Sequence, residues 1–227
     1  MGCCEAVPIS GEALIVKIFS DTNFKLKNFY YNKLLNRLSD FIINQELYKQ
    51  YIEEQLIPLF YNQNSYYDNK IYHKALFNKI LSYLEEKNSI YEVMIYLYPF
   101  IDHMNENVEE HLYSIFNYIG KKGQLNLRTL LSLFEKYIKF VTIDVNNLVA
   151  ENMENDEQKM SILELNKIYT EDNIKNYIAT NLFNLLKIYG QNDIITQEIF
   201  IDHFKHINIA NFDEIRNSIY AENLGKK

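Results

Sequence analysis

Cysteine is nearly absent from this sequence. Of its 227 residues only Cys3 and Cys4 are cysteines, and they stand next to each other at the N-terminal end. Adjacent cysteines rarely bridge each other and the rest of the chain offers no partner, so a disulfide framework is excluded and the reducing cytosol fits. A cysteine nucleophile within the folded body is excluded as well.

Glycine and proline are also scarce, with six and three in the whole chain. A β-sandwich or barrel with many tight turns would need more of both. The scattered glycines form neither a phosphate-cradling loop nor a dinucleotide fingerprint, and no serine lies in a glycine-framed nucleophile elbow. We find no catalytic site, and we expect neither an enzyme nor a bound cofactor.

An excess of positive charge is missing too. The chain has 30 acidic and 23 basic residues, which give a net charge of −7. We therefore expect no nucleic-acid partner, which would need a basic face, and no attachment to anionic lipid by charge alone. No apolar run reaches the roughly 18 residues of a transmembrane helix, and the N-terminus lacks the pattern of a secretion signal.

What the sequence does contain is apolar side chains at helical spacing. Hydrophobic residues make up 48% of the chain, which is enough to fill a core. One clean helical stripe consists of Val108, Leu112, Ile115, Phe116 and Ile119. Similar stripes recur along the chain without a convincing long strand, so the pattern predicts an all-α fold of roughly nine or ten helices.

The chain divides into three predicted parts. Residues 1–12 lack a helical pattern and form a tail, residues 13–105 form a first helical lobe, and residues 106–227 form a second. Within the second lobe the segment 151–159 (ENMENDEQK) is polar, acidic and without periodicity. We predict that it is a mobile insertion at the surface.

The first six residues, MGCCEA, resemble the N-myristoylation signature. The signature prefers serine or threonine at the sixth position, where this chain has alanine. The resemblance implies that Gly2 is acylated after removal of the initiator methionine and that Cys3 and Cys4 are palmitoylated. The expected location is the cytoplasmic face of the plasma membrane or of an internal membrane, with acyl chains in the bilayer. An accidental motif with unmodified cysteines is the alternative.

Three segments resemble the second half of an EF-hand, in which a central extended residue is followed by a helix. The central residues are Leu125, Ile195 and Ile71, and each precedes apolar residues at helical spacing. The helix that follows Leu125 carries Leu130, Leu133, Phe134 and Tyr137. The resemblance covers about half of the chain and implies two lobes of helix–loop–helix pairs with extra helices. Chance similarity within an ordinary helical array is the alternative.

The EF-hand resemblance is to a degenerate form, because the calcium ligands are missing. Calcium needs about six or seven oxygens, from loop positions 1, 3, 5, 9 and 12 among others. With Leu125 at position 8, these positions hold Tyr118, Gly120, Lys122, Asn126 and Thr129. With Ile195 there, they hold Ile188, Gly190, Asn192, Thr196 and Ile199. We expect no regular calcium binding.

Zinc is not expected either. Of the five histidines, His203 and His206 lie three apart on one predicted helix, while His103 and His111 flank an acidic turn. No cysteine or second histidine–carboxylate cluster completes a tetrahedral set. We expect these histidines at the surface or at helix ends, and no metal site.

These observations favour a membrane-anchored, non-catalytic adaptor that binds a partner protein. An apolar groove lined by tyrosine and phenylalanine would receive an amphipathic helix of the partner. The alternatives are a membrane-tethered helical-repeat scaffold, for which we find no self-similarity, and a weak calcium-responsive sensor. Helix–loop–helix units joined by a short two-stranded contact would favour the adaptor, and stacked helical hairpins would favour the scaffold.

Overall fold

The computed structural model describes residues 11–30, 34–36, 47–52, 54, 70–84, 87–88, 90–102, 108–119, 124–189, 194–206 and 212–224. Helices make up most of these residues, which confirms the predicted all-α class. Within the described ranges, no helix combines the length and the apolar character that a membrane crossing requires.

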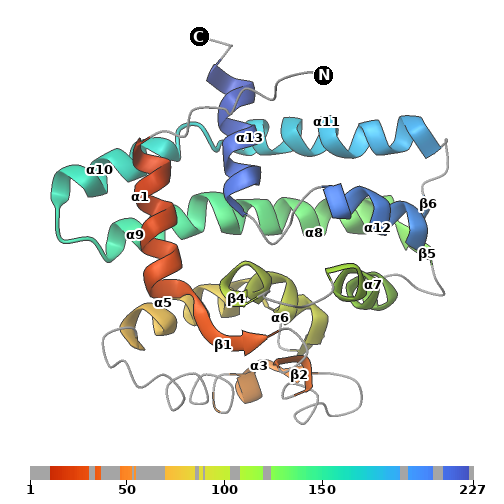
Figure 1. Cartoon of the computed structure of the whole chain (residues 1–227), viewed down its shortest axis with the longest axis horizontal. Coiled ribbons are helices and arrows are strands. Elements are labelled where there is room, and N and C mark those ends of the chain that lie inside the picture. The colour runs from red at the N-terminus through yellow and green to blue at the C-terminus, as the bar shows by residue number, and fades with distance from the viewer. Residues whose placement is uncertain are drawn as a thin grey trace.

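The helices and strands follow one another in a simple order (Figure 1). The α-helices are α1 (Gly11–Phe19), α3 (Lys49–Tyr51), α5 (Lys70–Tyr83), α6 (Ile90–Leu97), α7 (Val108–Ile119), α8 (Leu127–Lys139), α9 (Val145–Glu151), α10 (Asp156–Leu165), α11 (Glu171–Tyr189), α12 (Gln197–His206) and α13 (Phe212–Leu224). Two π-helical turns, η1 (Ser20–Phe24) and η5 (Phe140–Asp144), extend α1 and α8, and a 3-10 turn, η4 (Tyr98–Phe100), follows α6. The strands are β1 (Leu26–Tyr30), β2 (Leu47–Tyr48), β3 (Lys87–Asn88), β4 (Ile101–Asp102), β5 (Gln124–Asn126) and β6 (Ile194–Thr196).

Two helix–strand–helix units in the C-terminal half are joined through their strands. Strands β5 and β6 pair in antiparallel fashion, with Leu125 opposite Ile195 and both side chains buried. β5 leads directly into α8 and β6 directly into α12. The sequence predicted an extended residue at Leu125 and at Ile195, and both residues lie in strands in the structure.

A second antiparallel contact lies in the N-terminal half. Strand β2 pairs with β3, with Leu47 opposite Asn88, and helices α3 and α6 follow the two strands. The prediction of an extended residue at Ile71 is wrong. This side chain lies in the first turn of α5 and is 72% exposed. The helical stripe of buried residues already begins at His73, so the chain is helical where a strand was expected.

The buried apolar residues form one cluster that runs from Val16 in α1 to Ile219 in α13. Helix α8 presents Leu130, Phe134 and Tyr137 to it, and α11 packs beside α8. In Figure 1, α1 lies across α9, and it contacts both α9 and α10. The core therefore ties the first helix to the C-terminal half.

The predicted tail, the predicted lobe boundary and the predicted acidic insertion compare with the structure in three different ways. Helix α1 begins at Gly11, inside the segment assigned to the tail, and the lobe boundary near residue 105 lies outside the described residues. The acidic segment 151–159 comprises the end of α9, a turn and the first turn of α10. The Asn155 side chain caps α10 by accepting a hydrogen bond from Gln158 N at 3.0 Å. Its mobility stays a prediction.

Candidate functional site

Gly2, Cys3 and Cys4, the predicted lipidation residues, lie outside the described residues. Their acylation therefore stays a prediction. The nearest described element is α1, which begins at Gly11.

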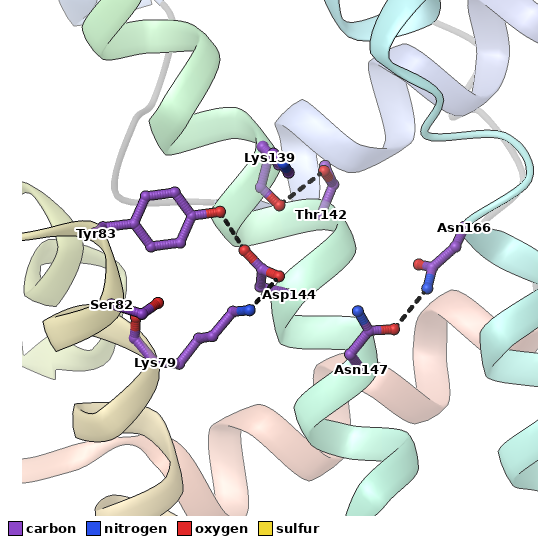
Figure 2. Close-up of polar contacts among 8 residues, drawn as sticks. All are labelled: Lys79, Ser82, Tyr83, Lys139, Thr142, Asp144, Asn147 and Asn166. Carbon is purple, nitrogen blue, oxygen red and sulfur yellow. Dashed lines mark hydrogen bonds and ion pairs between the residues drawn. The ribbon is translucent and has the colours of Figure 1, made fainter.

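A buried carboxylate, Asp144, joins two parts of the chain that are far apart in sequence. Its side chain is 6% exposed and its Oδ1 lies 2.8 Å from the ammonium Nζ of Lys79. The Tyr83 hydroxyl donates a hydrogen bond to Oδ2 of the same carboxylate. Figure 2 shows both donors reaching the carboxylate from one side. The charge of Asp144 is thus matched by an ammonium group and a phenol.

Local structure explains why these side chains meet. Lys79 and Tyr83 lie four residues apart on α5 and so project from one face of it. Asp144 ends the π-helical turn η5, where an extra residue rotates the following side chains by about 100° relative to a regular helix. The Thr142 hydroxyl of this turn donates to Ile138 O of α8 at 2.6 Å.

Aromatic rings surround the Tyr83 end of the contact. The Tyr83 ring centroid lies 5.2 Å from that of Tyr96 and 5.8 Å from that of Phe140. Burial, and then the hydrogen bond to Asp144, raise the pKa of Tyr83 far above its ordinary value. The hydroxyl therefore stays protonated and serves as a hydrogen-bond donor rather than as a base.

A second polar cluster lies beside the first, on α9 and the turn after α10. Asn146 donates to Asn166 Oδ1 at 2.9 Å, and Asn166 donates in turn to Asn147 Oδ1 at 2.8 Å. Arg216 of α13, which is fully buried, donates through Nη2 to Asn146 Oδ1. The amides thus connect α9, the end of α10 and α13.

Arg216 is a buried cation in contact with two neutral side chains. Besides Asn146, the Tyr169 hydroxyl contacts it and donates to the Arg216 backbone oxygen at 3.4 Å. Burial lowers the pKa of the guanidinium, while Tyr169 and Asp213 oppose that shift. Burial also raises the pKa of Tyr169. Removal of a buried charged group of this kind is expected to destabilise the fold, because its polar partners are left unpaired.

His111 lies in the first turn of α7, at a helix end as expected, but it is buried and not at the surface. This side chain is fully buried in α7, and its Nδ1 lies 3.2 Å from the Tyr98 hydroxyl. The buried stripe of α7 passes through His111 and Leu112, and a neutral imidazole with a hydrogen-bond partner can be buried there. His73 of α5 is buried too, and burial lowers its pKa.

Asn126, at one of the loop positions that supply calcium ligands in an EF-hand, serves as a helix cap. Asn126 would stand at loop position 9, but its side chain caps α8 by accepting a hydrogen bond from Arg128 N at 2.8 Å. Across the described part of the chain, no three His, Cys, Asp or Glu side chains gather where a metal ion could be held.

Sequence analysis missed Asp144, Asn146 and Arg216. A signal was present, because Asp144 and Asn146 interrupt an otherwise apolar stretch, and Arg216 occupies a position on the apolar stripe of α13. A polar residue at such a position is expected to be buried with a partner. The partners were not predictable, because Tyr83 is 61 positions from Asp144 and Asn146 is 70 positions from Arg216.

Comparison of the chain with protein-family models, with curated proteins and with solved structures finds no match.

Proposed function

We propose that this chain is a membrane-anchored, non-catalytic adaptor. Acyl chains on Gly2, Cys3 and Cys4 hold it at the cytoplasmic face of a membrane, and its paired helix–strand–helix units bind an amphipathic helix of a partner protein. The observation that best supports the binding of a partner helix is the antiparallel pairing of Leu125 with Ile195.

This pairing supports the EF-hand-like interpretation over a helical-repeat scaffold. The two C-terminal units, α7–β5–α8 and α11–β6–α12, are joined at their loops by strands, and α7 packs against α12 while α8 packs against α11. Stacked helical hairpins would pack through their helices alone, without a pair of strands joining their loops. Paired units of this kind can hold a helix between them.

Helix α13 supports the idea that the C-terminal pair accepts a helix. It contacts α11 and η5, at the ends of α8 and α11 that lie away from the strands (Figure 1). Ile215 and Ile219 are buried there, next to Arg216. We propose that α13 occupies in the free protein the position that the partner helix takes in the complex.

Two further observations support a role without calcium or catalysis. Asn126 caps α8, and Lys122 stands at another would-be ligand position of the same loop. The buried polar groups Asp144 and Asn146 are engaged in contacts that join helices. These contacts favour the adaptor over the calcium-responsive sensor.

Cross-linking of the full-length chain in its own cells tests the adaptor. Lys175 is half-exposed on α11, the helix that α13 contacts, and its ammonium group can react with an amine cross-linker. Ile219→Asp places a charge at a buried position and should loosen α13. We therefore expect it to increase several-fold the amount of one partner's peptides that are cross-linked to Lys175. The matched control is Ser218→Asp, which places the same charge on the exposed side of the same helix. Equal cross-linking in both variants, at unchanged helix content by circular dichroism, would contradict the proposal.

A further inference from the structure

Helix α1 carries an uncharged face that points away from the body. Gly11, Leu14, Ile15 and Ile18 recur at helical spacing along it. Leu14 is 45% exposed and Ile18 is 57% exposed, while Ile15 is partly buried. A Cβ atom added at Gly11 would meet no atom of the described residues within 4 Å. The outer face of α1 consists of the exposed residues Gly11, Leu14 and Ile18, with Ile15 at its edge, where it packs against the core.

The opposite face of α1 is fixed to the body. Ala13 and Val16 are buried, and the helix contacts α9 and α10. Lys17 Nζ lies 2.9 Å from Asp213 Oδ2 of α13, and this contact is the first cause of a raised pKa at Lys17. Because α1 is held in this way, its outer face has a fixed direction relative to the rest of the molecule.

The length of the tail indicates what covers the outer face. Gly11 lies only seven positions after Cys4. A fully extended chain of that length spans at most about 25 Å. An acyl chain on Cys4 would therefore keep α1 within about that distance of the bilayer surface. The chain carries a net charge of −7, so an electrically neutral lipid surface fits better than an anionic one.

We propose that the outer face of α1 lies on the membrane interface and orients the body on the bilayer. The proposal rests on the acylation in the proposed function. Leu14 and Ile18 supply the apolar contact, and Gly11 lets the helix approach closely. Burial of apolar side chains at the interface then adds to the binding that the acyl chains provide.

The composition of the chain allows a direct test. It contains no tryptophan, and Cys3 and Cys4 are its only cysteines. Ile18→Trp therefore introduces a single fluorescent reporter, and coupling both cysteines to a maleimide lipid attaches the full chain to vesicles of brominated phosphatidylcholine. The matched reporter is Ile194→Trp, which is also about half exposed (46%) and lies on β6, toward the other end of the molecule in Figure 1.

We expect bromine to quench the Ile18→Trp reporter at least about twofold more than the Ile194→Trp reporter, with emission shifted to shorter wavelength. Equal quenching of the two would overturn the proposal. A shift that needs no vesicles and grows with protein concentration would also overturn it, because the face would then bind a second copy. Since the lipid is attached chemically, these results do not depend on whether cells acylate the chain, which intact-mass analysis decides separately.

Variants of the face itself give a second readout. With Cys3→Ser and one lipid chain on Cys4, attachment is reversible and its dissociation rate can be measured. Leu14→Ser with Ile18→Ser should speed dissociation about tenfold. Gly11→Leu, whose Cβ meets no described atom within 4 Å, adds apolar surface and should slow dissociation about threefold. Rates unchanged by either variant would contradict a membrane-facing α1.

Discussion

Lys79 and Asp144 join the N-terminal and C-terminal parts of the chain, with 2.8 Å between Lys79 Nζ and Asp144 Oδ1. The carboxylate is buried, whereas the lysine is about one-third exposed (36%). The contact thus combines a desolvated anion with a cation that retains access to water. Removing the anion should leave Lys79 without its buried counter-charge.

We predict that Asp144→Asn lowers the free energy of unfolding by about 1–3 kcal/mol, because a charge-assisted contact is lost while Tyr83 keeps a weaker acceptor. The control is Glu164→Gln, which removes the exposed ion pair with Lys167 and should cost less than about 1 kcal/mol. Urea unfolding of each variant measures the difference. Equal losses in the two variants would show that Asp144 does not join the two parts.

The docking of α13 depends on Arg216. Arg216→Ala should lower the free energy of unfolding by about 3 kcal/mol, because it leaves a cavity and an unsatisfied Asn146 amide oxygen. Ser218→Ala, at an exposed position of the same helix, should change it by less than about 0.5 kcal/mol. Thermal unfolding followed by circular dichroism distinguishes these outcomes, and similar melting temperatures would argue against a docked α13.

Stability should fall in mild acid because of His73. Burial lowers its pKa in the folded chain below the unfolded value of about 6.5. Its contribution is therefore fully present above about pH 6.5 and is lost as the pH falls through the folded pKa. We expect the wild type to lose more unfolding free energy between pH 7.5 and pH 5.5 than His73→Gln does, as measured by urea unfolding. Parallel losses in the two proteins would place the pH dependence elsewhere.

The acidic segment 151–159 should be cut early by a glutamate-specific protease. Glu154 is exposed in the turn between α9 and α10, whereas Glu164 is exposed within α10. Because a turn fits a protease site more readily than a helix does, cleavage after Glu154 should precede cleavage after Glu164. Mass spectrometry of a digestion time course gives the order, and the reverse order would contradict the expected mobility.

Calcium should bind weakly or not at all. The loop positions around Leu125 lack carboxylates, and Asn126 is engaged as a helix cap. Titration calorimetry of the full chain should show no site in the range of about 10⁻⁷–10⁻⁵ M that is typical of sensors. A site in that range would favour the calcium-responsive alternative.

Features that depend on local pattern were predictable from the sequence. Leu125 and Ile195 could be placed in strands because each stands before a helix with regular apolar spacing. The same pattern failed at Ile71, where the helix begins earlier than the loop-like residues suggested. Strands β2 and β3 contain two residues each and are too short to show a period.

The polar contacts were not predictable for a different reason. The partners of Asp144 and Arg216 come from segments more than 40 positions away, and their meeting depends on how the helices pack. Sequence analysis could only have marked these residues as polar groups on apolar stripes. The π-helical turn that directs Asp144 toward α5 carries no signal in composition.

The expected strength of the membrane anchor follows from the composition of the N-terminal tail. One myristoyl chain binds a membrane only reversibly, on the order of 10⁴ M⁻¹, so stable attachment takes a second signal. The tail before Ala13 contains no lysine or arginine and has Glu5 and Glu12, so charge does not supply it. Acyl chains on Cys3 and Cys4, at about 0.8 kcal/mol per buried CH₂, would supply it.

The membrane-bound fraction of the full-length chain after cell fractionation, with intact-mass analysis of its N-terminal peptide, tests this claim most directly. Gly2→Ala should release the protein to the cytosol, because a chain without myristate rarely meets the palmitoylating membrane. Replacing Cys3 and Cys4 together by serine should leave a weakly bound, myristoylated protein, and replacing one should give an intermediate fraction. A Gly2→Ala protein that stays on the membrane, or a wild-type peptide without acyl mass, would contradict the account.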